Sequence, residues 1–264
     1  MKPTVRLTAA LAVTVTICLL WAGLGGSHRP RASSASGNDA ALPAAPAPAL
    51  TIGRPEPLRS SGFLSRWTSL RTTALARVRP AAGSRVVAEL RPTTPEGTAN
   101  VLAVLRAGPD AAGALWVKVR LPVLPNGRVG WVRRQALGAY QTVKTRLIVV
   151  RRELRATLYR NGKAVFTAPV GVGTASWPTP AGEFLVRSEL SRYASPFYGP
   201  VAFGTSARSA VLTDWPAGGF VGIHGTSEPQ LLPGRVSHGC IRMRNPDILR
   251  LAELMPVGTP LTIR

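Results

Sequence analysis

Short stretches in which apolar and polar residues alternate recur along the chain from about residue 64 onward. The clearest covers Trp116–Leu121 (WVKVRL), a pattern typical of a strand that buries one face. Pro125–Gly127 (PNG) then supplies a turn, and a second apolar stretch begins at Gly130–Val132. We therefore predict a small module of β-strands over residues 64–140.

The remaining residues, 143–264, show the same preference for strands. Asn161-Gly162 is a strong hairpin signal, because both residue types tolerate the positive φ angles of a tight turn and strand-forming residues flank them. Other short strands are predicted at Leu147–Val150, Gly182–Arg187, Ala210–Asp214, Gly222–His224 and Pro260–Ile263. This part of the chain is expected to be mainly β.

One helix is predicted near the end of the chain. Asn245 is a favourable N-cap residue, Pro246 fits the first helical position, and Asp247 suits the positive end of the helix dipole. Residues 248–255 then supply an apolar face. The domain at 143–264 is therefore expected to combine many strands with one late helix.

The N-terminal region carries an export signal. Residues 7–27 are mostly apolar, have no formal charge and follow a basic start with Lys2 and Arg6. The stretch exceeds the roughly 7–15-residue core of a signal peptide and is long enough to span a bilayer. We expect an extracytoplasmic protein, with residues 1–27 either cleaved as a signal peptide or kept as a membrane anchor facing the cell wall. Residues 28–63, rich in Ala, Pro and Ser, are predicted to form an extended linker.

The composition adds a strong positive charge to this picture. The 264 residues include 33 Lys and Arg against 12 Asp and Glu, a formal net charge of +21. Such a charge favours polyanionic surroundings: nucleic acid, an anionic membrane surface or an acidic cell-wall polymer. Long basic runs and nucleic-acid-binding motifs do not occur, so nucleic acid is not an expected partner. An anionic cell-wall polymer stays a candidate, next to the simpler interpretation that the arginines coat the surface.

Cysteine usage draws attention to one residue. Of the two cysteines, Cys18 lies within the apolar targeting segment, so Cys240 has no disulfide partner in the exported part of the chain. An unpaired thiol is a liability in an oxidising compartment unless it is buried or used. His224 and His238 precede Cys240 closely, and an imidazole is the usual activator of a nucleophilic thiol.

The neighbours of Cys240 suit acyl transfer. Gly239 lacks a side chain, which lets a substrate carbonyl approach and lets backbone N–H groups point at its developing oxyanion. Arg242 offers a fixed charge for a substrate carboxylate if this segment is extended. A zinc site made of His224, His238 and Cys240 is an alternative, as is a buried inert thiol, although no CxxC or HExxH motif accompanies these residues.

Residues 224–226 (HGT) and 237–243 (SHGCIRM) at this spacing resemble the L,D-transpeptidases, the YkuD domain family. Residues 179–184 (TPAGEF) look like the TPxGxF segment of that family, and the likeness extends over residues 143–264. The hairpin within residues 64–140 resembles a bacterial SH3-like domain. Together the resemblances imply a mainly β chain: a small SH3-like β-barrel followed by a YkuD-type β-sandwich with one late helix.

The resemblance to the L,D-transpeptidases also implies roles for individual residues. Cys240 corresponds to the nucleophile and His224 to the base that deprotonates it, with no metal or other cofactor. Backbone amides around residues 238–240 would form the oxyanion hole. The supporting residues would be Gly225, whose carbonyl orients the imidazole, Ser237, His238 and Gly239, and the substrate-binding residues would be Thr226 and Arg242.

The implied reaction has two acyl-transfer steps. The thiolate attacks the carbonyl between diaminopimelate and the terminal D-Ala of a peptidoglycan stem peptide, so that D-Ala leaves and a thioester remains. The side-chain amine of a second diaminopimelate then resolves the thioester and makes a cross-link. Two alternatives stay open: water could replace the amine, which would make an L,D-carboxypeptidase, or the chain could be a non-catalytic cell-wall-binding protein.

Overall fold

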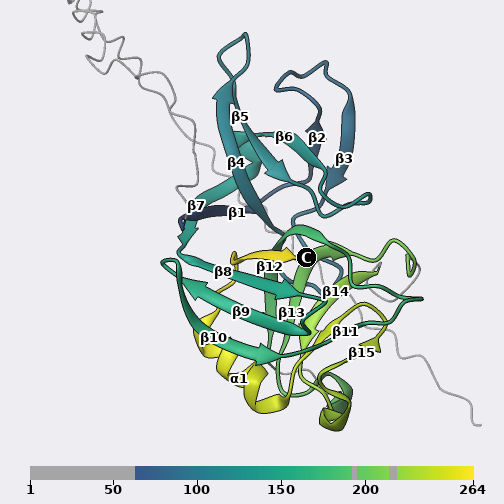
Figure 1. The fold of residues 1–264 in the computed structure, drawn as a ribbon. Helices are drawn as coiled ribbons and strands as arrows, with labels where there is room; N and C mark the ends of the chain where they lie inside the picture. Colours follow the sequence, from purple (N-terminus) through teal and green to yellow (C-terminus); the bar gives the residue numbers. More distant parts are fainter. Residues whose placement is uncertain (1–62, 192–194, 214–218) are drawn as a thin grey trace, which may run out of the picture. The chain divides into compact units, whose positions relative to one another are not determined.

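The computed structural model describes residues 63–191, 195–213 and 219–264 (Figure 1). The predicted targeting segment and all but the last residue of the predicted linker lie outside these ranges. Strands dominate the described residues, and one α-helix, α1 (Asn245–Leu254), lies late among them. The prediction of a mainly β chain with one late helix is confirmed. Within the ranges that the structure covers, no helix is long and apolar enough to cross a membrane.

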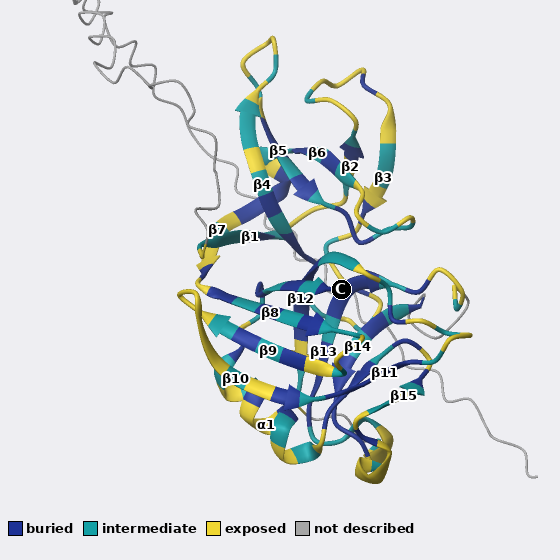
Figure 2. Ribbon diagram, in the orientation of Figure 1, coloured by how far each residue is buried: buried dark blue, intermediate teal, exposed yellow. Residues whose placement is uncertain are grey.

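The first sheet is built from the N-terminal module. It contains β1 (Ser65–Leu70), β2 (Ala74–Arg77), β3 (Val86–Leu90), β4 (Val101–Pro109), β5 (Leu115–Arg120), β6 (Val129–Arg133) and β7 (Leu137–Val143), in the order β3-β2-β6-β5-β4-β1-β7. β5 holds the predicted WVKVRL strand, with Trp116, Val117 and Val119 buried. Figure 2 shows the exposed residues concentrated in the loops of this module. The likeness to an SH3-like domain stays a prediction.

The second sheet carries the candidate site. Its strands are β8 (Thr145–Val150), β9 (Arg155–Arg160), β10 (Lys163–Pro169), β11 (Gly171–Gly173), β12 (Gly182–Leu190), β13 (Ala202–Arg208), β14 (Phe220–His224), β15 (Gly234–Ser237), β16 (Ile241–Arg242) and β17 (Pro260–Ile263). They lie in the order β10-β9-β8-β17-β12-β13-β14-β16-β11-β15. The short 3-10 helices are η1 (Arg134–Ala136), η2 (Pro196–Tyr198) and η4 (Pro229–Leu231).

The turn between β9 and β10 is the one that the sequence predicts. Asn161 and Gly162 have φ angles of 52° and 79°, in the left-handed region that these two residue types adopt most easily. The flanking residues Arg160 and Lys163 pair directly across the hairpin. The hairpin prediction is confirmed.

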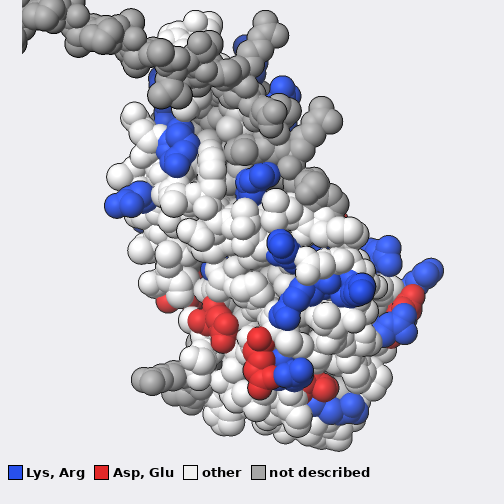
Figure 3. Space-filling view, turned by 90° about the vertical axis from the view of Figure 1, so that its left-hand side faces the viewer, with Lys and Arg blue, Asp and Glu red and all other residues white. Residues whose placement is uncertain are grey.

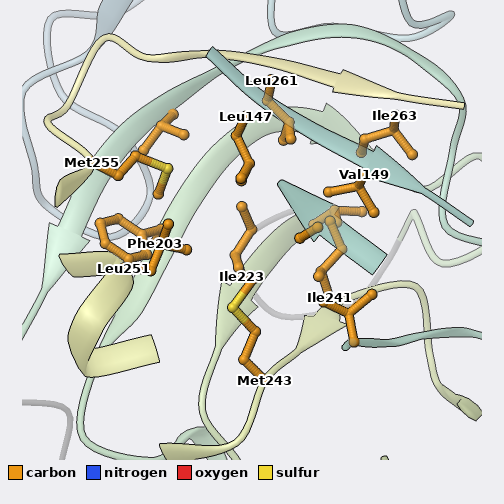
Figure 4. Packing of buried hydrophobic residues seen from close by; sticks show 14 of the residues in the cluster. Leu147, Val149, Phe203, Ile223, Ile241, Met243, Leu251, Met255, Leu261 and Ile263 are labelled. Carbon is orange, nitrogen blue, oxygen red and sulfur yellow. The ribbon is translucent and has the colours of Figure 1, made fainter. Parts of the chain in front are cut away.

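The second sheet and α1 enclose a hydrophobic core (Figure 4). Its buried members include Leu147, Val149, Phe203, Ile223, Ile241, Met243, Leu251, Met255, Leu261 and Ile263. Burying one large apolar side chain contributes about 1.5–3 kcal/mol. Ile223 of β14 lies opposite Ile241 of β16 in a parallel pairing, and both side chains belong to this core. The core therefore fixes the two strands that carry the candidate site.

The strand predicted at Ala210–Asp214 is wrong for residues 210–213, where the chain bends, and Asp214 lies outside the described ranges. The hydroxyl of Ser209 accepts hydrogen bonds from the N–H groups of Val211 and Leu212 at 3.2 and 3.0 Å. A serine that bonds the backbone ahead of it favours a turn over a strand. The strand of this region lies earlier, at β13.

The predicted cap of α1 is also wrong. The helix begins at Asn245 rather than after it, and Arg244 occupies the N-cap position without a side-chain cap hydrogen bond. Pro246 and Asp247 lie in the first turn, as the sequence predicts. The Asn245 side chain has a different partner, in the loop that follows β14.

Candidate active site

Two neighbouring parallel strands bring the predicted nucleophile and base together. His224 ends β14 and pairs with Arg242 of β16, and Cys240 directly precedes β16. The N–H of Gly222 donates to Cys240 Sγ at 3.4 Å. A Cβ built on Gly222 would lie 3.9 Å from both Cys240 Sγ and His224 Cδ2. The thiol and the imidazole therefore face the same point on β14.

The imidazole of His224 is held in a defined tautomer. Its Nδ1 lies 2.6 Å from the carbonyl oxygen of Gly225. Because a carbonyl oxygen can only accept, Nδ1 carries the proton in this hydrogen bond, which leaves Nε2 of the neutral ring as an acceptor. A ring in this state can take a proton from a thiol. Gly225 thus occupies the position that the sequence-based hypothesis gives it.

The environment of His224 disfavours its charged form. The residue is buried, with 2% of its surface exposed. Tyr198 of η2 packs edge-on against its ring at 4.8 Å, and Phe197 lies at 6.3 Å. Burial lowers the pKa of His224 from 6.5 to about 4; the positive charge of Arg242 adds to the effect, while the hydrogen bond to Gly225 opposes it. The imidazole is therefore neutral at neutral pH.

Cys240 is likewise neutral at rest, as a protonated thiol. Burial raises the pKa of its thiol, while the N–H of Gly222 and the charge of Arg242 act in the opposite direction. A neutral thiol next to a neutral imidazole differs from a preformed thiolate–imidazolium pair. Such a neutral pair is the starting state that general-base activation of a thiol requires.

The hydroxyl groups of two residues hold the turn at residues 237–240, which we call the SHGC turn. Ser237 donates to the carbonyl of Cys240 at 2.6 Å and accepts from the N–H of Gly239 at 3.1 Å. The buried hydroxyl of Thr179 donates to the carbonyl of Gly239 and accepts from the N–H of Gly173, both at 2.8 Å. Gly239 has a φ of 114°, which side-chain-bearing residues rarely adopt. Its N–H, one of the amides expected in the oxyanion hole, is engaged by Ser237.

A cavity of about 150 Å³ opens onto this pair. Cys240 and His224 lie in its wall together with the rings of Phe197, Tyr198 and Phe220. Most of the surface that the cavity exposes is apolar, and Ser209, Ser237, His238 and Arg242 add polar groups to its lining.

Two other residues shape the surroundings of the cavity. The guanidinium groups of Arg187 and Arg208 both lie over the Phe220 ring, at 4.0 and 5.0 Å from its centroid. His238 is exposed, lines the cavity and packs against Trp177 in a tilted arrangement, with 4.3 Å between ring centroids. His238 thus lies at the edge of the site, whereas His224 lies inside it.

The two predicted substrate-binding residues differ in placement. Arg242 lines the cavity, but its Nη1 donates to the Glu228 carboxylate at 3.1 Å and its guanidinium lies over the Phe197 ring. Thr226 is buried, and its hydroxyl accepts from the N–H of Glu228 at 3.0 Å. Their roles in substrate binding stay predictions.

Sequence reasoning did not assign a role in the site to Thr179, Phe197 or Tyr198. The TPAGEF segment was a signal for Thr179, whereas nothing in the sequence marks the two rings. Within residues 63–191, 195–213 and 219–264, no three His, Cys, Asp or Glu side chains lie together as metal ligands would.

Comparison with known proteins identifies the C-terminal part of the chain. Residues 144–263 match the family model of YkuD, the L,D-transpeptidase catalytic domain. The putative L,D-transpeptidase YkuD of Bacillus licheniformis is 34% identical over 122 residues, which cover 46% of this chain and 67% of that protein. The putative L,D-transpeptidase YkuD of Bacillus subtilis is 38% identical over 107 residues, 40% of this chain and 58% of that protein.

Among solved structures, the catalytic domain of the Enterococcus faecium L,D-transpeptidase is 24% identical, with a TM-score of 0.35, and the match covers 46% of this chain and 96% of that one. The residues that match the family model include His224 and Cys240. The chain belongs to the family of L,D-transpeptidases with a YkuD catalytic domain.

Proposed function

We propose that this protein is an extracytoplasmic peptidoglycan L,D-transpeptidase in which Cys240 is the nucleophile and His224 the general base. The observation that carries the proposal is their joint position in the wall of one cavity, with the imidazole tautomer fixed by Gly225. An inert buried thiol has no need of an oriented base beside it. The substrate in this proposal is a stem peptide that ends in D-Ala.

The first step forms a thioester. His224 Nε2 takes the thiol proton while Cys240 Sγ attacks the carbonyl carbon between diaminopimelate and D-Ala. When the tetrahedral intermediate collapses, the C–N bond breaks and the same proton passes to the departing amine of D-Ala. The N–H of Gly239 is engaged by Ser237, so the other backbone amides around residues 238–240 would stabilise the developing oxyanion.

The second step transfers the acyl group to an amine. The side-chain amine of a second diaminopimelate attacks the thioester carbon, His224 accepts the proton of that amine, and the C–S bond breaks. The proton then returns to Cys240. Water in place of the amine would give a carboxypeptidase with the same two residues, so the acceptor has to be measured.

The electrostatics of the site support a base that is neutral before attack and charged only transiently. Burial opposes the imidazolium, and the Gly225 carbonyl stabilises it. The charge of Arg242 favours the thiolate form of Cys240. Burial disfavours the thiolate as well, so these two interactions, which are stronger with the charged forms than with the neutral ones, offset part of the cost of charging the pair.

The proposed location is the cell wall, outside the cytoplasm, with the apolar segment 7–27 as a membrane anchor if it is not cleaved. Figure 3 shows Lys and Arg side chains in several separate groups on one face of the molecule rather than in one continuous stripe. Such a distribution suits loose attraction to an anionic wall polymer more than a single defined site.

The test combines intact-mass spectrometry with product analysis. Incubation of the full chain with a carbapenem is expected to give a one-to-one adduct on Cys240 that the Cys240→Ala variant does not form. With a disaccharide tetrapeptide that contains diaminopimelate, wild type should release D-Ala and form a cross-linked dimer, and His224→Gln should release D-Ala far more slowly. Free tripeptide without dimer would identify a carboxypeptidase. Unchanged D-Ala release by Cys240→Ala would overturn the nucleophile, and stoichiometric zinc lost on this substitution would favour a metal site.

A further inference from the structure

The peptide unit between Gly225 and Thr226 makes a hydrogen bond at each of its ends. Its carbonyl oxygen accepts from His224 Nδ1 at 2.6 Å, and its N–H donates to the side-chain Oδ1 of Asn245 at 2.9 Å. We propose that Asn245 is a positioning residue for the general base, acting through this one peptide. The inference rests on the proposed function, because it assigns His224 the role of base.

Planarity makes the coupling direct. A peptide unit has almost no freedom about its C–N bond, so its N–H and C=O turn together. Rotation that released the N–H from Asn245 would also swing the carbonyl away from His224. Donation through the N–H in addition polarises the amide, which makes its carbonyl a better acceptor for the imidazole.

The packing around Asn245 leaves little room for another arrangement. A Cβ on Gly225 would lie 2.4 Å from Asn245 Oδ1, and a Cβ on Gly199 would lie 2.5 Å from the same oxygen. Gly199 directly follows η2, whose Tyr198 packs against the His224 ring. The Asn245 amide therefore fits between the segment that orients Nδ1 and the segment that carries the neighbouring ring.

The start of α1 points to the same role. Asn is among the best N-cap residues, and the sequence pattern predicts that Asn245 caps the helix. In the structure Asn245 is instead the first helical residue, and the N-cap position is held by Arg244 without a side-chain cap bond. The side chain that could cap the helix instead binds the backbone of Thr226, in the loop that follows β14.

The consequence concerns the tautomer of His224. While the Gly225 carbonyl holds the proton on Nδ1, Nε2 is available to accept the thiol proton. Without Asn245 the peptide is free to rotate, Nδ1 loses its fixed acceptor, and rings that carry the proton on Nε2 become populated. Those rings cannot act as the base toward Cys240. The turnover rate falls, while the residues that bind the stem peptide are unchanged.

The experiment compares three substitutions in the full chain. Asn245→Leu and Asn245→Ala remove the acceptor, and Asn245→Asp keeps an oxygen in the same place. We expect the first two to lower kcat for D-Ala release about tenfold to a hundredfold, the effect of leaving one buried amide without its acceptor, with KM within about twofold of wild type. Asn245→Asp should restore kcat to within a few-fold. Leu249→Ala, on the exposed side of α1, is the matched control for a change in the helix and should retain the wild-type kcat.

A second readout is independent of activity. The 15N chemical shifts of the His224 ring separate the two tautomers. Wild type and Asn245→Asp should show the proton on Nδ1, whereas Asn245→Leu and Asn245→Ala should shift the population toward Nε2. An unchanged tautomer with unchanged kcat in folded Asn245→Leu or Asn245→Ala overturns the inference. If wild type neither releases D-Ala nor is acylated at Cys240, the proposed function fails, and the tautomer measurement still decides the role of Asn245.

Discussion

His224 contributes a pH-dependent part of the folding free energy, because it is buried in its neutral form. Burial lowers its pKa from 6.5 to about 4 in the folded protein. In the unfolded chain the imidazole titrates near its ordinary value. Between these two pH values the unfolded state binds a proton that the folded state does not, so the free energy of unfolding decreases as the pH falls.

The size of the effect follows from the two pKa values. Above pH 6.5 the imidazole is neutral in both states and its contribution is complete; below about 4 it is charged in both and the contribution is lost. Each pH unit between the two values corresponds to about 1.36 kcal/mol. The expected loss is about 3 kcal/mol on going from neutral pH to about pH 4, a large share of the roughly 5–15 kcal/mol that stabilises a typical domain.

Urea unfolding of wild type and of His224→Gln measures this contribution. Gln is polar and does not titrate, so the difference between the two proteins removes the effect of the carboxylates that also titrate in this range. Wild type should lose about 3 kcal/mol more than the variant between about pH 7 and about pH 4. Cys240→Ala, which keeps the imidazole, should follow wild type.

Parallel pH dependence in wild type and His224→Gln would refute this reasoning. It would mean that the imidazole titrates at its ordinary pKa in the folded protein. The resting site would then exchange protons with solvent near neutral pH, and a neutral thiol–imidazole pair would no longer describe it.

Three further predictions concern the nucleophile and its turn. Thr179→Val, which removes the hydroxyl between Gly173 and Gly239, should slow carbapenem acylation about tenfold, whereas Thr179→Ser should stay within about twofold of wild type. Stopped-flow fluorescence measures the acylation rates, and equal rates for Thr179→Val and wild type would contradict the role of the hydroxyl. Gly173→Ala should lower Tm by several degrees or prevent folding, because its Cβ would lie 2.1 Å from the Trp177 carbonyl oxygen. Gly83→Ala is the control, because the added Cβ there has open space, and equal Tm values for the two variants would contradict the predicted clash. Iodoacetamide should alkylate Cys240 with a midpoint above the ordinary thiol value of about 8.5, because burial raises its pKa; a midpoint below that value would contradict the protonated resting state.

Local sequence signals predict those elements whose form neighbouring residues decide. Asn161-Gly162 makes a turn in almost any context, and the structure has that turn. β13 (AFGTSAR) lacks a clean alternation and becomes a strand because β12 and β14 pair with it on both sides. Val211 and Leu212 resemble strand residues, but the Ser209 hydroxyl holds their N–H groups in a turn. The strand β13 is decided by pairing partners outside its own segment, so its pattern does not reveal it. At Val211 and Leu212 the apolar pattern competes with a local serine turn, and the turn prevails.

In the site, too, the sequence reveals the residues whose type and local spacing carry the chemistry, but not the contacts between distant segments. Cys240 and His224 are visible in the sequence because their residue types and spacing carry the chemistry. Thr179 acts on a residue 60 positions later, and Asn245 on one 19 positions earlier, through hydrogen bonds that exist only in the folded chain. Arg242 is predicted to offer a fixed charge for a substrate carboxylate; the structure pairs it with Glu228, and sequence spacing could not show that pairing.

Because β14 pairs directly with β16, the positions of His224 and Cys240 do not depend on the length of the loop that joins these two strands. Ile223 and Ile241 are anchored in the core, so the sheet sets the spacing of His224 and Cys240 whatever the chain does between them. In that connection the η4 segment is exposed around Gln230, and lengthening such a loop changes the entropy of closing it only slowly. Insertions at Gln230 could therefore change the length and composition of this exposed loop while the spacing of His224 and Cys240 stays the same.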